Sequence, residues 1–194
     1  MKSILISLFL SFQIFAAIGV GESASDFKLT NQNGDEITLS QFKGKIIVLE
    51  WMNHGCPFVK KHYNSGNMQK LQKDYRDQVV WLSIISSSEG KQGYSTPDQA
   101  LSDMKEKKSY ARFVLIDQSG DVGHAYGAKT TPHMFIIGKD FKIKYEGAID
   151  SIASTDTDDI KGAKNYVKEA LDNLMAGKEV AVARTKSYGC SVKY

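Results

Sequence analysis

Cys56 lies in the segment NHGCPFVKKHY, which directly follows the apolar run 46–51. The apolar run predicts a buried strand, and proline is favoured at the first position of a helix, so Cys56 is expected where a strand ends and a helix begins. Backbone N–H groups at a helix N-terminus stabilise a thiolate, and Lys60 and His54 would add positive charge. The segment therefore predicts a reactive thiol at Cys56, shaped by Pro57; an inert buried cysteine is the alternative.

Thiol chemistry needs a second sulfur, and Cys190 is the only other cysteine in the chain. It lies in the C-terminal segment YGCSVKY, whose Tyr188, Val192 and Tyr194 offer apolar groups for docking. An even number of cysteines in an exported protein favours pairing. We expect Cys190 to resolve an oxidised Cys56 by forming a disulfide. A static disulfide without redox function and an unpaired tail cysteine are the alternatives.

Histidines near Cys56 raise the possibility of a metal site. His54 and His62 flank the cysteine, and His133 follows Pro132 further along the chain. One cysteine with two or three histidines could hold copper or zinc, so a metal-binding module is an alternative function. A single histidine near a helix is more often a surface or hydrogen-bonded group. We expect no metal and no cofactor.

The N-terminus has the pattern of a secretory signal peptide. Lys2 is followed by an apolar run over residues 4–15 and then by small residues. Cleavage is expected after Gly19, with Ala16 as the second choice, and residues 1–22 are set apart from the folded domain. The run is short and contains polar residues, so no stable membrane association is expected after cleavage. The mature protein is expected to be periplasmic or extracellular, where disulfides persist.

The remainder of the chain has the composition of one globular domain. It has 194 residues, of which 42% are hydrophobic and 24% charged, enough for a sizeable core. The net charge of +3 is small and the basic residues are scattered, so no nucleic-acid partner is expected. No repeat or linker divides the sequence. We expect a domain over residues 23–176 and a tail over 177–194 that carries Cys190; the sequence does not indicate an oligomeric state.

Hydrophobic periodicity and turn residues predict the elements that position the cysteines. The expected strands and helices alternate after an opening hairpin around Asn33-Gly34, which implies a mixed sheet with helices on both faces. The strands are expected at 46–51, 79–85 and 112–117; the segment 130–138 leads into a further strand, and 141–149 is its hairpin partner. The helices are expected from residue 57 with a break at 64–67, at 97–108, at 120–128, and as one long helix at 158–177.

Two long segments carry a resemblance to a known family. Residues 27–51 and 114–149 resemble the opening and closing parts of the redoxin (AhpC/TSA) branch of the thioredoxin-like fold, and the likeness extends over about residues 25–175. CPFVKKHY and the closing GCSVKY are similar to a peroxiredoxin-like subgroup. The resemblance implies a central mixed sheet with helices on both faces and an N-terminal β-hairpin. It also implies that Pro132 is cis, between Thr131 and His133, and faces the active cysteine.

The sequence departs from the family pattern in ways that limit its chemistry. The first active-site cysteine of the family matches Cys56, but the second falls on Val59. Peroxiredoxins have Thr or Ser where this chain has Asn53, and Arg near the place of Pro132. The resemblance thus implies a thiol–disulfide or antioxidant oxidoreductase with weak peroxide turnover, acting on a thiol or disulfide protein or a small oxidant. Glu50 would be a proton shuttle by resemblance, although a satisfied core acid is the simpler interpretation.

Overall fold

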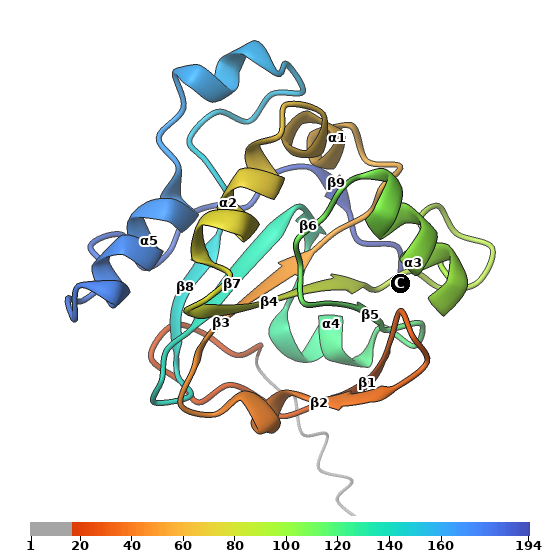
Figure 1. Cartoon of the computed structure of the whole chain (residues 1–194), viewed down its shortest axis with the longest axis horizontal. Coiled ribbons are helices and arrows are strands. Elements are labelled where there is room, and N and C mark those ends of the chain that lie inside the picture. The colour runs from red at the N-terminus through yellow and green to blue at the C-terminus, as the bar shows by residue number, and fades with distance from the viewer. Residues whose placement is uncertain (1–16) are drawn as a thin grey trace, which may run out of the picture.

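The computed structural model describes residues 17–194, and within them seven strands form one central sheet. Its order is β2-β1-β5-β4-β3-β7-β8 (Figure 1). The pairs β3–β4 and β4–β5 are parallel, whereas the other neighbours are antiparallel, so the sheet is mixed. The strands are β1 (Lys28–Asn31), β2 (Glu36–Thr38), β3 (Ile46–Trp51), β4 (Val79–Ile85), β5 (Phe113–Ile116), β7 (His133–Ile137) and β8 (Ile143–Gly147).

Helices cover both faces of this sheet (Figure 1). Four α-helices contribute buried side chains to the hydrophobic cluster on one face, and α4 does so on the other, together with residues of the N-terminal hairpin and the η1 turn. This is the predicted thioredoxin-like α/β arrangement. The first group comprises α1 (Pro57–Asn64), α2 (Asn67–Tyr75), α3 (Pro97–Glu106) and α5 (Tyr166–Met175); the second face carries α4 (Asp121–Tyr126) and η1 (Leu39–Phe42).

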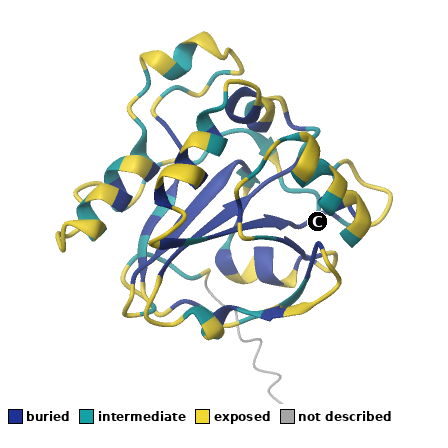
Figure 2. Cartoon of the chain, viewed as in Figure 1, coloured by how far each residue is buried: buried dark blue, intermediate teal, exposed yellow. Residues whose placement is uncertain are grey.

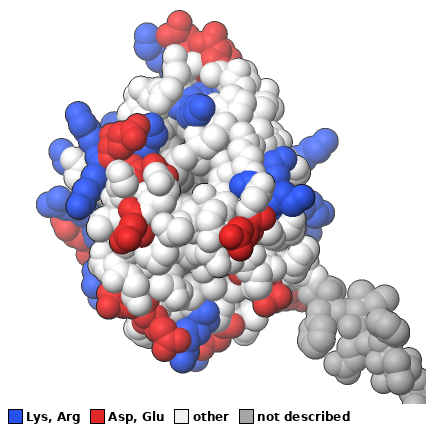
Figure 3. Space-filling model, turned by 90° about the vertical axis from the view of Figure 1, so that its right-hand side faces the viewer, with Lys and Arg blue, Asp and Glu red and all other residues white. Residues whose placement is uncertain are grey.

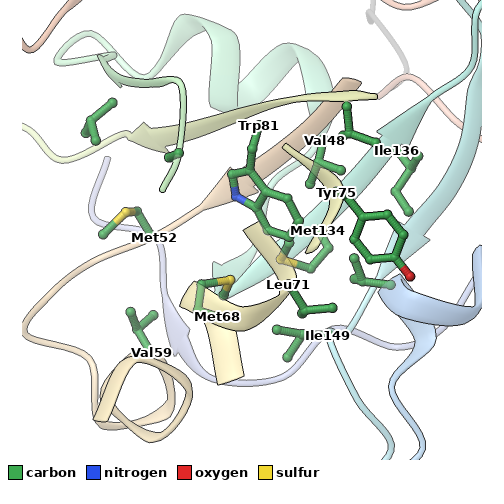
Figure 4. Close-up of a cluster of buried hydrophobic side chains, with 14 of the residues drawn as sticks. Val48, Met52, Val59, Met68, Leu71, Tyr75, Trp81, Met134, Ile136 and Ile149 are labelled. Carbon is green, nitrogen blue, oxygen red and sulfur yellow. The ribbon is translucent and has the colours of Figure 1, made fainter. Parts of the chain in front are cut away.

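The core follows from the alternation of side chains along the central strands. All six residues of β3 are buried, with Val48 directed into the cluster on one face and Leu49 into the cluster on the other. Trp81 lies in the middle of the first cluster, among side chains from strands and helices (Figure 4). The central strands of the sheet are buried, β1 and β2 at its edge are partly exposed, and the helices keep exposed outer faces (Figure 2). A continuous apolar run thus produces a strand covered on both sides.

Several predicted elements match the structure, and one does not. The hairpin turns at Asn33-Gly34, and β3 and β4 have the expected bounds. The prediction of one long helix over 158–177 is wrong. A 3-10 turn, η2 (Asp158–Lys161), ends before Gly162, and α5 begins only after Asn165, whose side-chain oxygen accepts the N–H of Lys168 at 2.8 Å. Ile160 is therefore outside the apolar stripe of α5, because Asn165 is an effective helix N-cap.

The segment just after residue 16 packs against the domain. Ile18 donates its backbone N–H to Ala125 at 3.2 Å, and Gly21 donates to Ile143 at 2.9 Å. The side chains of Ile18 and Val20 lie against the hydrophobic cluster on the α4 face. The packed part of the chain thus includes residues before position 23. Residues 1–16 of the predicted signal peptide (1–22) lie outside the described residues. No helix in the described part is both long and apolar enough to cross a membrane.

Candidate functional site

Cys56 occupies the junction between β3 and α1 that the sequence predicts. It is the N-cap residue of α1, and Pro57 takes the first helical position. The Cys56 N–H donates to the Asn53 carbonyl at 2.9 Å, and its own carbonyl accepts the N–H of Lys60 at 2.9 Å. The side chain is fully buried, and its thiol contacts the carbonyl oxygen of Thr131 at 3.0 Å. The sulfur therefore lies beneath other chain segments and not on open surface.

The segment over Cys56 consists of the cis-proline loop and the C-terminal tail. The Thr131–Pro132 peptide bond is cis. The short strand β6 (Thr130–Thr131) precedes it and pairs antiparallel with β9 (Cys190–Ser191), with Thr131 opposite Cys190. The structure thus brings Cys56, Pro132 and Cys190 together, as expected from the sequence and the resemblance. Both cysteines are free thiols.

The two thiols differ in acidity. Burial raises the pKa of Cys56, but hydrogen bonds from Cys190, from the Thr131 side chain and from nearby backbone groups outweigh burial and bring the pKa below the ordinary thiol value. The Thr131 hydroxyl is buried and makes no hydrogen bond to another described residue, so it is free to donate to a thiolate. Burial and the neighbouring Cys56 sulfur raise the pKa of Cys190 to about 11. Cys56 is therefore the more acidic thiol of the pair, and Cys190 is the weaker acid, which favours Cys56 as the nucleophile.

Positive side chains contribute less than expected. Lys60 is exposed, and the groups that lower the pKa of Cys56 are hydrogen-bond donors. His54 packs edge-on against Tyr63 with ring centroids 5.8 Å apart, and burial lowers its pKa. Burial therefore disfavours the charged form of His54, which runs against the expectation that it adds positive charge. The reason is that its ring is largely withdrawn from water.

The histidines do not converge on Cys56. His133 is buried against Phe135, its Nδ1 accepts the N–H of Lys129 at 3.3 Å, and burial lowers its pKa to about 4. His62 is hydrogen bonded on both ring nitrogens by other residues. Within residues 17–194, no three His, Cys, Asp or Glu side chains are grouped closely enough to hold a metal ion. The metal-binding alternative therefore has no geometric support.

Glu50 is a core acid inside a hydrogen-bond network. It is fully buried, and one carboxyl oxygen accepts the indole N–H of Trp81 at 2.8 Å and the hydroxyl of Ser83 at 2.9 Å. The other oxygen accepts the hydroxyl of Tyr63 at 3.1 Å. Burial nevertheless raises the pKa of Glu50 to about 7, because these donors only partly compensate for the loss of water. Within the described residues no hydrogen bond joins Glu50 to Cys56, so the core role fits better than the proton shuttle.

The tail that carries Cys190 follows a fixed path across the domain. It pairs with β8 through Glu146 and Arg184, reaches β6 at Cys190, and ends with the Tyr194 ring stacked on His124 at 3.9 Å between centroids. Gly189 sits directly before Cys190 with φ 123°, and a Cβ there would overlap the Thr131 carbonyl. Only glycine lets the tail approach β6 this closely.

Sequence reasoning missed a buried polar cluster beside the tail. Lys61 and His62 on α1 meet Asp150, which follows β8, and Tyr188 of the tail. The helical period held a partial signal, because His62 lies four residues after Phe58 and therefore on the same face. The sequence held no comparable signal for Lys61, which is buried against Asp150 and the Ile152 carbonyl, about ninety residues away in the chain.

Charges on the surface are mixed. On the face that Figure 3 shows, Lys and Arg alternate with Asp and Glu around a largely uncharged centre. A nucleic-acid footprint would require a continuous basic stripe, which this face lacks. The shape and charge of this face carry no argument for a specific partner.

Comparisons with known proteins agree with this geometry. Residues 20–146 match the model of the AhpC/TSA family. A thiol-disulfide oxidoreductase ResA from Bacillus thuringiensis subsp. konkukian is 27% identical over 127 residues, which is 66% of this chain and 68% of that protein. An uncharacterized conserved protein from Geobacillus kaustophilus has a crystal structure similar to this fold, with a TM-score of 0.76, 26% identity and 94% of both chains covered. A hypothetical protein from Sinorhizobium meliloti 1021 gives a TM-score of 0.77 at 24% identity, covering 92% of this chain and 96% of the other. The fold, the cysteine at the helix start and the matched segment together place this chain in the AhpC/TSA family.

Proposed function

We propose that this protein is an exported thiol–disulfide oxidoreductase of a peroxiredoxin-like type, in which Cys56 is the nucleophile and Cys190 the resolving thiol. The observation that carries the proposal is the pairing of β6 with β9, which holds Cys190 opposite Thr131, whose carbonyl contacts the Cys56 sulfur. The opposite pKa shifts of the two thiols support the same roles. The naming of the Bacillus relative as a thiol-disulfide oxidoreductase adds support for the reaction class.

The reaction follows from this asymmetry. The Cys56 thiolate attacks a partner disulfide, forms a mixed disulfide and releases one partner thiolate. Cys56 then no longer carries the negative charge that helps to raise the pKa of Cys190, so Cys190 loses its proton more readily. The Cys190 thiolate attacks the Cys56 sulfur, forms the intramolecular disulfide and releases the second partner thiol. The partner gains two electrons and the protein loses two, and a reducing dithiol reverses the sequence.

Peroxide is expected to be a poor substrate. Asn53 stands where peroxiredoxins have a hydroxyl residue, and its side chain is engaged elsewhere: Oδ1 accepts the N–H of Gly55 at 2.8 Å, and Nδ2 donates to the Gln92 carbonyl at 3.0 Å. Pro132 cannot supply the positive charge of an arginine. Without groups that orient and polarise peroxide, the rate advantage from positioning is small. Efficient peroxide consumption that disappears in Cys56→Ser would contradict this part of the proposal.

Thiol counting on the mature protein tests the central claim. Two thiols should be titrated after reduction and none after mild oxidation at high dilution, and mass spectrometry should map the bridge to Cys56 and Cys190. A disulfide that a thioredoxin-type reductant opens and a disulfide substrate reforms supports a catalytic pair. Two persistent free thiols would overturn the proposal, and a bridge that resists reduction in the folded protein would leave only a structural disulfide.

Export is part of the proposal, and the packing favours one of the two expected cleavage sites. Cleavage after Gly19 would remove Ile18, which packs on the hydrophobic cluster of the α4 face and donates a hydrogen bond to Ala125. Cleavage after Ala16 keeps both contacts. We therefore expect the mature chain to begin at Ala17, and N-terminal sequencing of protein from the native source checks it. A native protein that retains Lys2 would contradict export.

A further inference from the structure

A cluster of buried polar groups joins the helix of Cys56 to the tail of Cys190. The side chains of Lys61 and His62 have no solvent exposure, and that of Asp150 is 2% exposed. Lys61 Nζ lies 3.6 Å from Asp150 Oδ2 and donates to the Ile152 carbonyl at 2.9 Å. The tail enters this cluster through Tyr188, whose hydroxyl donates to Asp150 Oδ1 at 2.5 Å. The cluster thus connects three segments that are distant in the sequence.

The donor and the acceptor of each hydrogen bond between His62, Tyr188 and Asp150 can be assigned. Burial lowers the pKa of His62 to about 4, although Asp150 opposes the shift, so the ring is neutral at pH 7. The amide of Asn67 donates to His62 Nδ1 at 2.9 Å, which leaves the proton on Nε2. Nε2 is 3.2 Å from the Tyr188 hydroxyl and donates to it, while that hydroxyl donates to Asp150. Burial raises the pKa of Tyr188, which keeps this hydroxyl a donor.

The contact between Tyr188 and Asp150 bears on the position of Cys190, because Tyr188 is close to Cys190 in the tail. Tyr188 lies two residues before Cys190, and its ring packs on Phe58 of α1 with centroids 5.8 Å apart. Cys190 itself is partly exposed and is tied to β6 by one short strand pair. Phe58 is also two residues from Cys56 along α1. The two anchors therefore fix the tail and the helix relative to each other right beside the two sulfurs.

We infer that Tyr188 is a positioning residue for the Cys56–Cys190 reaction, with the buried Lys61–His62–Asp150 group as the latch that holds it. The inference rests on the proposed function, because it assigns Cys190 the resolving role. Buried ion pairs contribute little net stability, since desolvation offsets their attraction. The Lys61–Asp150 pair under the tail is therefore better explained by a role in fixing the position of the tail than by a gain in stability. With the latch closed, Cys190 covers Cys56 and captures it when oxidised. With the latch open, Cys56 is exposed to other reagents.

Alkylation of Cys56 measures the latch directly. In a Cys190→Ser background only Cys56 can react, and it is fully buried, so modification by iodoacetamide requires the tail to open. Tyr188→Phe keeps the ring on Phe58 and removes only the hydroxyl. Hydrogen bonds to a carboxylate are among the strong ones, so we expect alkylation about tenfold faster in this variant. Tyr110→Phe, at an exposed site outside the tail, is the matched control and should leave the rate unchanged.

Two further measurements separate positioning from a general loss of stability. Local tail opening predicts an alkylation rate that is insensitive to low urea and exceeds the rate allowed by global unfolding. In the protein with both cysteines, the equilibrium of the Cys56–Cys190 disulfide with glutathione should shift about tenfold towards the reduced form in Tyr188→Phe, equivalent to about 30 mV. Tyr188→Ala, which also loses the ring contact, should shift further in both measurements.

The outcomes distinguish this inference from the function on which it rests. Alkylation and disulfide equilibria in Tyr188→Phe that equal those of the wild type would overturn the latch while leaving the redox pair intact. An alkylation rate that rises only in proportion to the global unfolding constant would also overturn it. If the wild type forms no Cys56–Cys190 disulfide but Tyr188→Phe still speeds alkylation, the latch stands and the resolving role of Cys190 fails.

Discussion

Replacing Glu50 with glutamine should change how the stability of the protein depends on pH. The carboxyl group has a pKa of about 7 in the folded protein and 4.5 in an unfolded chain. Between these values the folded state holds a proton that the unfolded state has lost, so the stability of the wild type falls as pH rises. At about 1.4 kcal/mol per pKa unit, the ionised carboxylate costs about 3 kcal/mol of stability above pH 7, and nothing below pH 4.5.

Glutamine removes this titration with little change in shape. Its oxygen can accept from Trp81 and Ser83 as one carboxyl oxygen does now, and its amide can donate to the Tyr63 hydroxyl in place of the other. Relative to the wild type, Glu50→Gln should therefore gain about 3 kcal/mol between pH 4.5 and pH 7 and then stay level. The free energies come from urea unfolding curves of both proteins across this range, in which the other titrating groups cancel.

A matched control keeps the interpretation specific. Glu36→Gln removes one negative charge from an exposed side chain on β2 and shows how much of the effect is due to net charge alone. A constant difference between Glu50→Gln and the wild type over the whole range would refute the reasoning, because it would mean that Glu50 is ionised in the folded state at all these pH values. A difference that falls as pH rises would show that the hydrogen-bond donors outweigh burial.

Two further predictions concern the tail. Gly189→Ala should displace the tail from β6 at a cost of about 1–3 kcal/mol, because the new Cβ would overlap the Thr131 carbonyl and the residue would keep an unfavourable positive φ. The Cys56–Cys190 disulfide should then form more slowly after mixing with oxidised glutathione, and an unchanged rate would count against the docked tail. Cys190→Ala should raise the pKa of Cys56, because it removes a hydrogen-bond donor to the sulfur, whereas Cys190→Ser should raise it less. The pH dependence of thiolate ultraviolet absorbance measures the pKa of Cys56 in both variants. Equal pKa values in the two variants would contradict the role of Cys190 as a hydrogen-bond donor.

Local sequence patterns were sufficient to predict the elements whose formation depends on neighbouring residues. The apolar runs at β3 and β4 have the predicted bounds, and the Asn33-Gly34 turn forms the expected hairpin. The position of Cys56 was also predictable, because an apolar strand followed by a cysteine and Pro57 is a local pattern. The family resemblance added the cis bond before Pro132, which lies far from Cys56 in the chain.

The identity of the distant groups that meet at Cys56, and their effect on its pKa, depends on contacts that form only in the folded chain. Cys190 reaches the site because the tail pairs with β6 and is anchored at Asp150, and no local pattern encodes either contact. The positive charge expected from His54 is disfavoured because the fold partly removes its ring from water, and lost hydration lowers the pKa of an imidazole. A sequence shows which groups can ionise, but burial and hydrogen-bond partners, which the whole fold creates, determine the charge that they carry.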